Sequence, residues 1–221
     1  MGGLWGSFAN VCIHRLPKEQ DVVSGRSHCP KCKKKISIQY IFVEIISIFS
    51  FFSIYYLYGI TLTTLLLMIL SLSFIIIFFI DLKHFIIPNL ITFPMMALGF
   101  IKSFDPNLNS IFPNYILSIL GGLFGYGIIW SITFLYKQIK KKEGMGLGDA
   151  KLLSVFGFWF GLKAVPFVIF LSSAIALISV IPDLMKKSKT MSSQIPFGPY
   201  IILGALVYLI LEKKIDNLFY I

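Results

Sequence analysis

The chain has 221 residues, of which 57% are apolar and only 14% are charged, and its mean hydropathy is +0.83. An ordinary soluble domain has about 45–50% apolar and about 25% charged residues, so a soluble globular protein is excluded. The 16% of aromatic residues, the 17 glycines without a period and the 3 cysteines also exclude a disordered, a collagen-like and a disulfide-rich secreted chain. The composition therefore predicts a multi-pass membrane protein.

Apolar runs long enough to cross a bilayer core of about 30 Å predict an all-α, polytopic membrane helix bundle with about seven to eight hydrophobic segments. In chain order the runs are 2–13, 38–58, 60–80, 86–101, 114–136, 152–182 and 198–211. The first is too short to cross alone, and it lacks the basic start and the cleavage site of a signal peptide. In 152–182, the residues Gly161, Lys163 and Pro166 predict a break and hence a helical hairpin.

The basic residues fall mostly on one side of these segments. Counting turns puts 14–37, 81–85, 137–151 and 183–197 on one side, with 16 of the 20 Lys and Arg residues. By the positive-inside rule this side is cytoplasmic. The net charge of +10 therefore marks orientation, and no nucleic-acid partner is expected.

Two aspartates stand where apolar runs meet polar sequence. Asp81 ends one apolar run, and Asp149 precedes the run that starts at Leu152. The chain between them crosses the membrane twice, so both carboxylates are expected at the cytoplasmic interface at similar depth. An isolated aspartate at such a place more often caps a helix or reaches toward the headgroups, whereas a pair at one depth favours a functional site.

Two carboxylates that meet can share one proton, because two like charges at hydrogen-bond distance do not both ionise. The ionised one takes a proton from water while the protonated one hydrogen-bonds the carbonyl under attack, and the amide is hydrolysed. Gly146 and Gly148 fit a substrate-positioning role, since a backbone without Cβ atoms either approaches an extended peptide closely or adopts a positive φ. The pattern thus indicates peptide cleavage, with Asp81 and Asp149 as the catalytic groups.

Four segments in this order resemble the motifs of type IV prepilin peptidases, the leader peptidase family of GxGD-type membrane aspartyl proteases. They are Gly6–Pro17 (GSFANVCIHRLP), Asp81–Asn89 (DLKHFIIPN), Gly146–Leu152 (GLGDAKL) and Ile195–Pro199 (IPFGP). The resemblance extends over nearly the whole chain. It implies a single membrane-embedded peptidase domain over 1–221, with 14–37 as a short cytoplasmic loop.

The resemblance also implies what the protein acts on and where. Members of the family remove the short basic leader of type IV prepilins and pseudopilins at the cytoplasmic face of the bacterial plasma (inner) membrane. Asp81 and Asp149 would be the catalytic pair, and the peptidase step would require no cofactor. The expected partners are prepilin or pseudopilin substrates and the lipid bilayer.

The loop 14–37 departs from the family pattern. Long members carry two CxxC pairs that are thought to hold zinc, whereas this chain has one pair, Cys29 and Cys32. Because tetrahedral zinc takes four ligands, a zinc site completed by other residues and an idle reduced pair both stay open. Many members also methylate the new N-terminus with S-adenosylmethionine, and here that activity stays open too.

Two alternatives accompany these predictions. Glu44 lies inside the segment 38–58, where an unpaired carboxylate is costly, so we expect a basic partner from the first loop, or else a role in binding or methylation. A membrane transporter or ion-relay subunit using Asp81 and Asp149 is the competing function. The boundary positions of both acids and the lack of an apparent inverted repeat argue against it.

Overall fold

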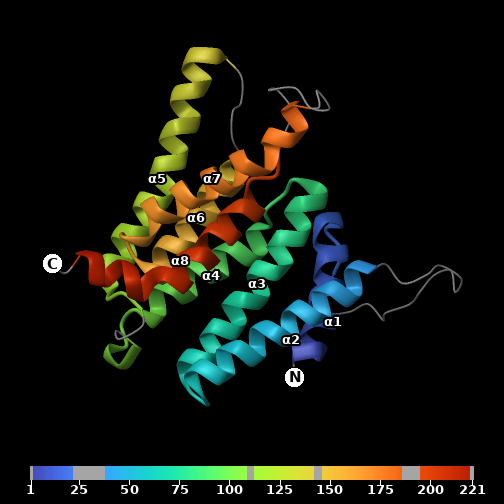
Figure 1. Ribbon diagram of the computed structural model, residues 1–221, viewed down its shortest axis with the longest axis vertical. Helices are drawn as coiled ribbons and strands as arrows, with labels where there is room; N and C mark the ends of the chain where they lie inside the picture. Colours follow the sequence, from blue (N-terminus) through green and yellow to red (C-terminus); the bar gives the residue numbers. More distant parts are fainter. Residues whose placement is uncertain (1, 22–37, 109–111, 142–145, 186–194, 220–221) are drawn as a thin grey trace, which may run out of the picture. The chain divides into compact units, whose positions relative to one another are not determined.

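The computed structural model describes residues 2–21, 38–108, 112–141, 146–185 and 195–219, and in these ranges the chain is helical (Figure 1). The helices are α1 (Gly2–Arg15), α2 (Ile38–Tyr58), α3 (Leu62–His84), α4 (Asn89–Lys102), α5 (Tyr115–Lys140), α6 (Leu147–Phe160), α7 (Ala164–Met185) and α8 (Gly198–Phe219), with 3₁₀ turns at Leu16–Lys18 and Pro106–Leu108. The expected all-α class is confirmed. The chain packs as two units, Met1–Pro88 and Asn89–Ile221, and each is described by itself. The single domain over 1–221 stays a prediction.

Four of the described helices are long and apolar enough to cross a membrane, namely α2, α3, α5 and the part of α7 up to Ile181. The helix α4 and the first part of α8 are shorter apolar helices. This confirms a membrane helix bundle. Two helices extend beyond the apolar runs expected from the sequence: α3 continues to His84 and α5 continues to Lys140. Basic side chains suit these positions because they face the negative end of the helix dipole.

The first unit is built on a tight α2–α3 hairpin. Gly59 has a φ of 64° in the turn, a left-handed conformation that favours glycine. Thr61 caps α3 by accepting a hydrogen bond from the Thr64 N–H at 3.2 Å, and the Thr64 hydroxyl donates to the Gly59 carbonyl at 2.7 Å. These bonds satisfy backbone groups that a helix end in a membrane would leave unpaired.

In the second unit, α5 and α6 approach each other through small residues. A Cβ on Gly121 would lie 2.5 Å from the Gly157 carbonyl oxygen, and a Cβ on Gly125 would lie 2.8 Å from the Leu153 carbonyl oxygen. Neither contact leaves room for a side chain. The glycines therefore set how closely the two backbones pack, as in other membrane helix pairs.

The helix α4 lies along α6 in the same unit. The indole N–H of Trp159 donates to the Met95 carbonyl at 2.8 Å, and the Lys102 ammonium donates to the Trp159 carbonyl at 3.1 Å. Lys102 is buried and lies 3.9 Å from the ring centroid of Phe112. Near the N-terminal end of α6, Lys151 donates to Asn89, the first residue of α4. Because like ends of the two helices are joined, α4 and α6 run in the same direction.

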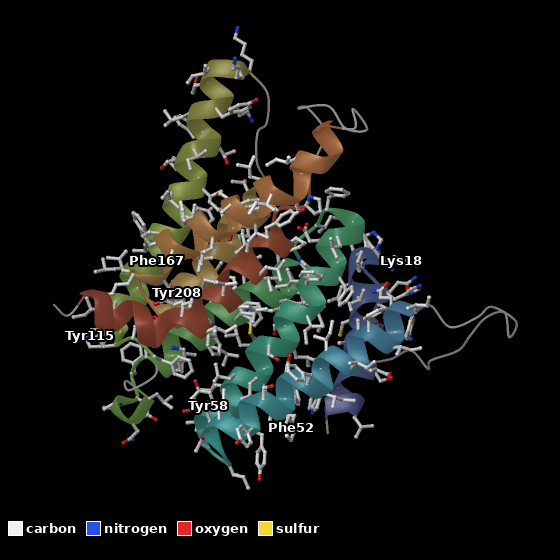
Figure 2. All side chains as sticks on the ribbon, in the orientation of Figure 1. Lys18, Phe52, Tyr58, Tyr115, Phe167 and Tyr208 are labelled. Carbon is white, nitrogen blue, oxygen red and sulfur yellow. The ribbon has the colours of Figure 1, made fainter. Side chains whose placement is uncertain are left out.

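The break expected within 152–182 is confirmed. The helix α6 ends at Phe160, Gly161 follows with a φ of 80°, and α7 begins at Ala164. Pro166 is the third residue of α7, where a missing N–H removes no bond within the helix. The helix α7 pairs with α8, and the rings of Phe167 and Tyr208 lie with centroids 6.2 Å apart (Figure 2).

Candidate active site

Asp81 lies in the last turn of α3. The helix ends where Phe85 adopts a left-handed φ of 56° and donates its N–H to the Asp81 carbonyl at 3.0 Å. The Asp81 side chain is only 4% exposed, and the neighbouring Ile77 and Ile80 are fully buried. A buried carboxylate at this place differs from one that reaches toward the headgroups, so the structure favours a specific role for Asp81.

Asp149 lies in the first turn of α6. Gly146 is the N-cap of this helix, and its carbonyl accepts a hydrogen bond from the Asp149 N–H at 3.2 Å. The side chain of Asp149 is 9% exposed. A negative charge here is stabilised by the positive end of the helix dipole.

The two glycines of the second motif do not adopt a positive φ. Gly146 has a φ of −73°, Gly148 lies within α6, and among the described glycines only Gly59 and Gly161 have positive values. The positive-φ explanation is therefore wrong, because Gly146 is an extended N-cap with a ψ of 140° and Gly148 already lies within the helix. A Cβ on Gly146 would lie 3.7 Å from Oδ2 of Asp149, an ordinary contact. Close approach of a substrate backbone stays a prediction for both glycines.

The packing of α5 on α6 fixes the level of Asp149 along α5. The helices are antiparallel, with Gly121 beside Gly157 and Gly125 beside Leu153. Continuing this register places Asp149 level with Ile129. From there α5 runs on to Lys140, about 16 Å at 1.5 Å per residue, and its last turns extend past α6 (Figure 1).

These last turns of α5 are apolar for most of their length. Trp130, Phe134 and Tyr136 are 46%, 48% and 43% exposed, and the first lysine of this end is Lys137. Large exposed apolar side chains belong in the bilayer. Asp149 therefore lies level with the hydrophobic part of α5, about 12 Å from the level of Lys137.

Lys151 connects the second motif to the last residue of the first motif. Its Nζ donates to Oδ1 of Asn89 at 2.7 Å and lies 5.4 Å from the ring centroid of Phe93. Asn89 is the first residue of α4. Both residues belong to the two motifs, but the sequence alone indicates no role for either. The sequence does contain a signal for such a role, because Asn89 and Lys151 are polar residues that each stand near the beginning of an apolar run.

Asp81 and Asp149 belong to different units, Met1–Pro88 and Asn89–Ile221. Each lies where the sequence put it, at the end of one apolar helix and at the start of another. The meeting of the two carboxylates in one site follows from the topology and stays a prediction.

Comparisons with known proteins agree with the motifs. Residues 68–181, which contain both aspartates, match the type IV leader peptidase family, and residues 1–55 match the bacterial Peptidase A24 N-terminal domain. The chain belongs to the type IV leader peptidase family. It is therefore a membrane-embedded peptidase, and the transporter alternative is set aside.

Relatives in this family include proteins named prepilin leader peptidase/N-methyltransferase. They come from Pseudomonas aeruginosa (27% identical, covering 98% of this chain and 90% of the relative), Xanthomonas campestris pv. campestris (34%, 94% and 88%) and Aeromonas salmonicida (30%, 96% and 89%). These alignments run over 255 to 265 positions, so each relative has internal residues that the 221-residue chain lacks. A first loop without the second CxxC pair fits that difference. No solved structure matches the chain.

Cys29 and Cys32, for which a zinc site and an idle reduced pair both stay open, lie outside the described residues. His14, His28 or Cys12 could supplement such a pair, and of these Cys12 is buried in α1. His14 is exposed, and partial burial together with the charge of Lys18 lowers its pKa, which favours the neutral imidazole that binds metals. In the part of the chain that the structure describes, no three His, Cys, Asp or Glu residues cluster. Zinc stays a prediction.

The N-terminal motif packs against the segment that contains Glu44. A Cβ on Gly6 would lie 2.8 Å from the Cα of Glu44, and one turn away the Asn10 amide donates to the Tyr40 carbonyl at 3.2 Å. Asn10 is 2% exposed, and its Oδ1 is buried without a hydrogen-bond partner. The sequence analysis did not single out Asn10, although an amide in an apolar segment is a recognisable signal. The first-loop partner expected for Glu44 stays a prediction.

Proposed function

We propose that the chain removes the basic leader from type IV prepilins or pseudopilins at the cytoplasmic face of the bacterial plasma membrane. Asp81 and Asp149 are the catalytic carboxylates in this proposal. Two observations support the substrate class and the orientation: the relatives carry the name prepilin leader peptidase, and 16 of 20 basic residues fall on the side of the two aspartates.

The observation that carries the proposal is that both motif aspartates are buried at helix ends, in the last turn of α3 and the first turn of α6. A carboxylate held at each of two helix ends can be brought to a shared water without disturbing the helices. Burial also favours one shared proton over two charges. The pair is thereby prepared for acid and base roles at neutral pH.

In the proposed reaction, one aspartate is ionised and the other protonated. The ionised carboxylate removes a proton from water as the water oxygen bonds to the scissile carbonyl carbon, and the protonated carboxyl donates a hydrogen bond to the carbonyl oxygen. The C–N bond then breaks, and the departing amine takes the proton. The pair returns to its starting protonation after each cleavage, so the step requires no metal and no cofactor.

The names of the relatives, prepilin leader peptidase/N-methyltransferase, also support N-methylation of the new N-terminus as a second step. S-adenosylmethionine would supply the methyl group. Its cationic part would fit the half-buried carboxylate of Glu44 in α2 and Oδ1 of Asn10 in α1, whose amide bonds Tyr40 one helical turn before Glu44. These two residues would hold the donor.

The test is cleavage of a purified type IV prepilin by the full chain reconstituted in liposomes. Asp81→Asn and Asp149→Asn should each lower the cleavage rate by about 1000-fold or more, because each removes one partner of the acid–base pair. Gel filtration and circular dichroism verify that both variants insert and fold.

Asp105→Asn is the matched control. Asp105 precedes the 3₁₀ turn after α4, where its carboxylate accepts from the Asn107 N–H at 3.0 Å, far along the chain from either motif. This variant should cleave at the wild-type rate. Full activity of either motif variant would refute the proposed catalytic pair, and lack of cleavage by the wild-type chain would refute the substrate class.

A further inference from the structure

The helices α4 and α6 are joined at both ends by a lysine. At the N-terminal ends, Lys151 of α6 donates to Oδ1 of Asn89 at 2.7 Å. At the C-terminal ends, Lys102 of α4 donates to the carbonyl of Trp159 at 3.1 Å. Between them, Trp159 donates to the carbonyl of Met95 at 2.8 Å. The two parallel helices are thus fixed to each other along their whole length.

The bond of Lys151 is directed away from Asp149. Two residues along an α-helix correspond to a rotation of about 200°, so the side chains of Asp149 and Lys151 leave α6 on nearly opposite sides. The ammonium of Lys151 bonds the Asn89 amide and covers the ring of Phe93. Both of these contacts are with α4.

Lys151 is half-exposed near the start of α6, and a charge this close to apolar sequence favours a specific role. The amide oxygen and the aromatic face stabilise its charge in place of water. The bond also fixes the start of α6 to a defined place. Asn89 is the first residue of α4 and the last residue of the motif that starts at Asp81. Lys151 therefore fixes the turn that carries Asp149 to the segment that follows Asp81.

We propose that Lys151 is a positioning residue for the peptidase reaction, and that its hydrogen bond to Asn89 holds the Asp149 turn of α6 against the N-terminal end of α4. This inference rests on the proposed function. Loss of the bond leaves Asp149 in its helix but lets the start of α6 shift against α4. A shift of about 1 Å in a catalytic group lowers a rate by about 100-fold.

The experiment measures kcat and KM for cleavage of a purified type IV prepilin by the liposome-reconstituted chain. Lys151→Met removes the donor and keeps the apolar stem, so kcat should fall by about 100-fold while KM stays within about twofold. Asn89→Leu removes the acceptor and should have the same effect. The double variant should be no slower than either single variant, because all three lose one and the same bond.

Conservative variants separate positioning from bulk stability. Lys151→Arg keeps a cationic donor, and Asn89→Asp keeps an acceptor, so both should retain kcat within about threefold. Lys102→Met is the matched control, since it cuts the lysine bond at the opposite ends of the same two helices. Whatever its melting temperature, its folded fraction should keep the wild-type kcat.

Three outcomes would overturn the inference: wild-type kcat in Lys151→Met, additive losses in the double variant, or an equal loss of kcat in Lys102→Met. If Lys151→Met does not fold, Asn89→Leu measures the same bond from the other side. An inactive wild-type chain would instead count against the proposed substrate, so the two failures are distinguishable.

Discussion

Three charged side chains of the second unit each lie beside a group that compensates their charge. Asp149 lies in the first turn of α6, at the positive end of the helix dipole. Lys102 bonds a carbonyl in the last turn of α6 and faces the ring of Phe112. Lys151 bonds the Asn89 amide. Such local partners explain how a membrane helix bundle keeps charged side chains next to its apolar segments.

The glycines between α5 and α6 provide a prediction at the same scale. Gly157→Ala should lower the free energy of unfolding by about 1–3 kcal/mol, because its Cβ would overlap the Gly121 carbonyl and force the helices apart. Unfolding in mixed detergent micelles, followed by circular dichroism, measures the change.

Gly127→Ala is the control for this prediction. Its Cβ would meet nothing within 4 Å, so the variant should be neutral or more stable by up to about 1 kcal/mol from helix propensity. Equal destabilisation by the two substitutions would contradict the close approach of α5 and α6.

At the scale of the helices, the difference in length between α5 and α6 sets the depth of Asp149. The helices α4 and α6 have 14 residues each, or about 21 Å, whereas α5 has 26 residues, or about 39 Å. Because α5 and α6 are aligned through Gly121 and Gly157, the extra length of α5 lies beyond Asp149. The aspartate is thereby placed below the level of the lysines that end α5.

Spin labels on α5 test this depth. In a cysteine-free background, labels at Trp130→Cys and Lys137→Cys should differ in depth by about 10 Å, with the first label deeper, because seven residues separate them along a helix. Both positions are described in α5, and Trp130 is half exposed. Oxygen and nickel accessibility in electron paramagnetic resonance measures the depth. Equal interfacial accessibility would place Asp149 at the membrane surface instead.

For the whole molecule, the distribution of basic residues decides the orientation in the membrane. The predicted cytoplasmic side holds the C-terminal end of α5, with Lys137, Lys140 and Lys141, and the opposite side holds the turn around Asn107. Anionic lipids and the insertion machinery favour the basic side inside.

Labelling with a membrane-impermeant maleimide tests this orientation. Lys141 and Asn107 are both exposed, so cysteines at these positions are accessible in the folded chain. Lys141→Cys should react in inverted membrane vesicles and Asn107→Cys in right-side-out vesicles. The reverse pattern would place the aspartates on the outer side and would refute a cytoplasmic cleavage site.

The sequence by itself determined the membrane class, the hydrophobic segments, the break at Gly161 and the placement of Asp81 and Asp149 at helix ends. These features depend on composition and on residues close together in the chain, where hydropathy and proline or glycine act locally. The inference of a positive φ at Gly146 failed because the start of a helix is set by capping and packing, not by the apolar run alone.

Only the tertiary structure decided the level of Asp149 along α5, the burial of Lys102 and the bond between Lys151 and Asn89. Each of these joins residues that are far apart in the chain. Hydropathy records that a residue prefers the membrane but not which neighbour it will meet there. That choice is made by the packing of small residues and by the need of each buried polar group for a partner.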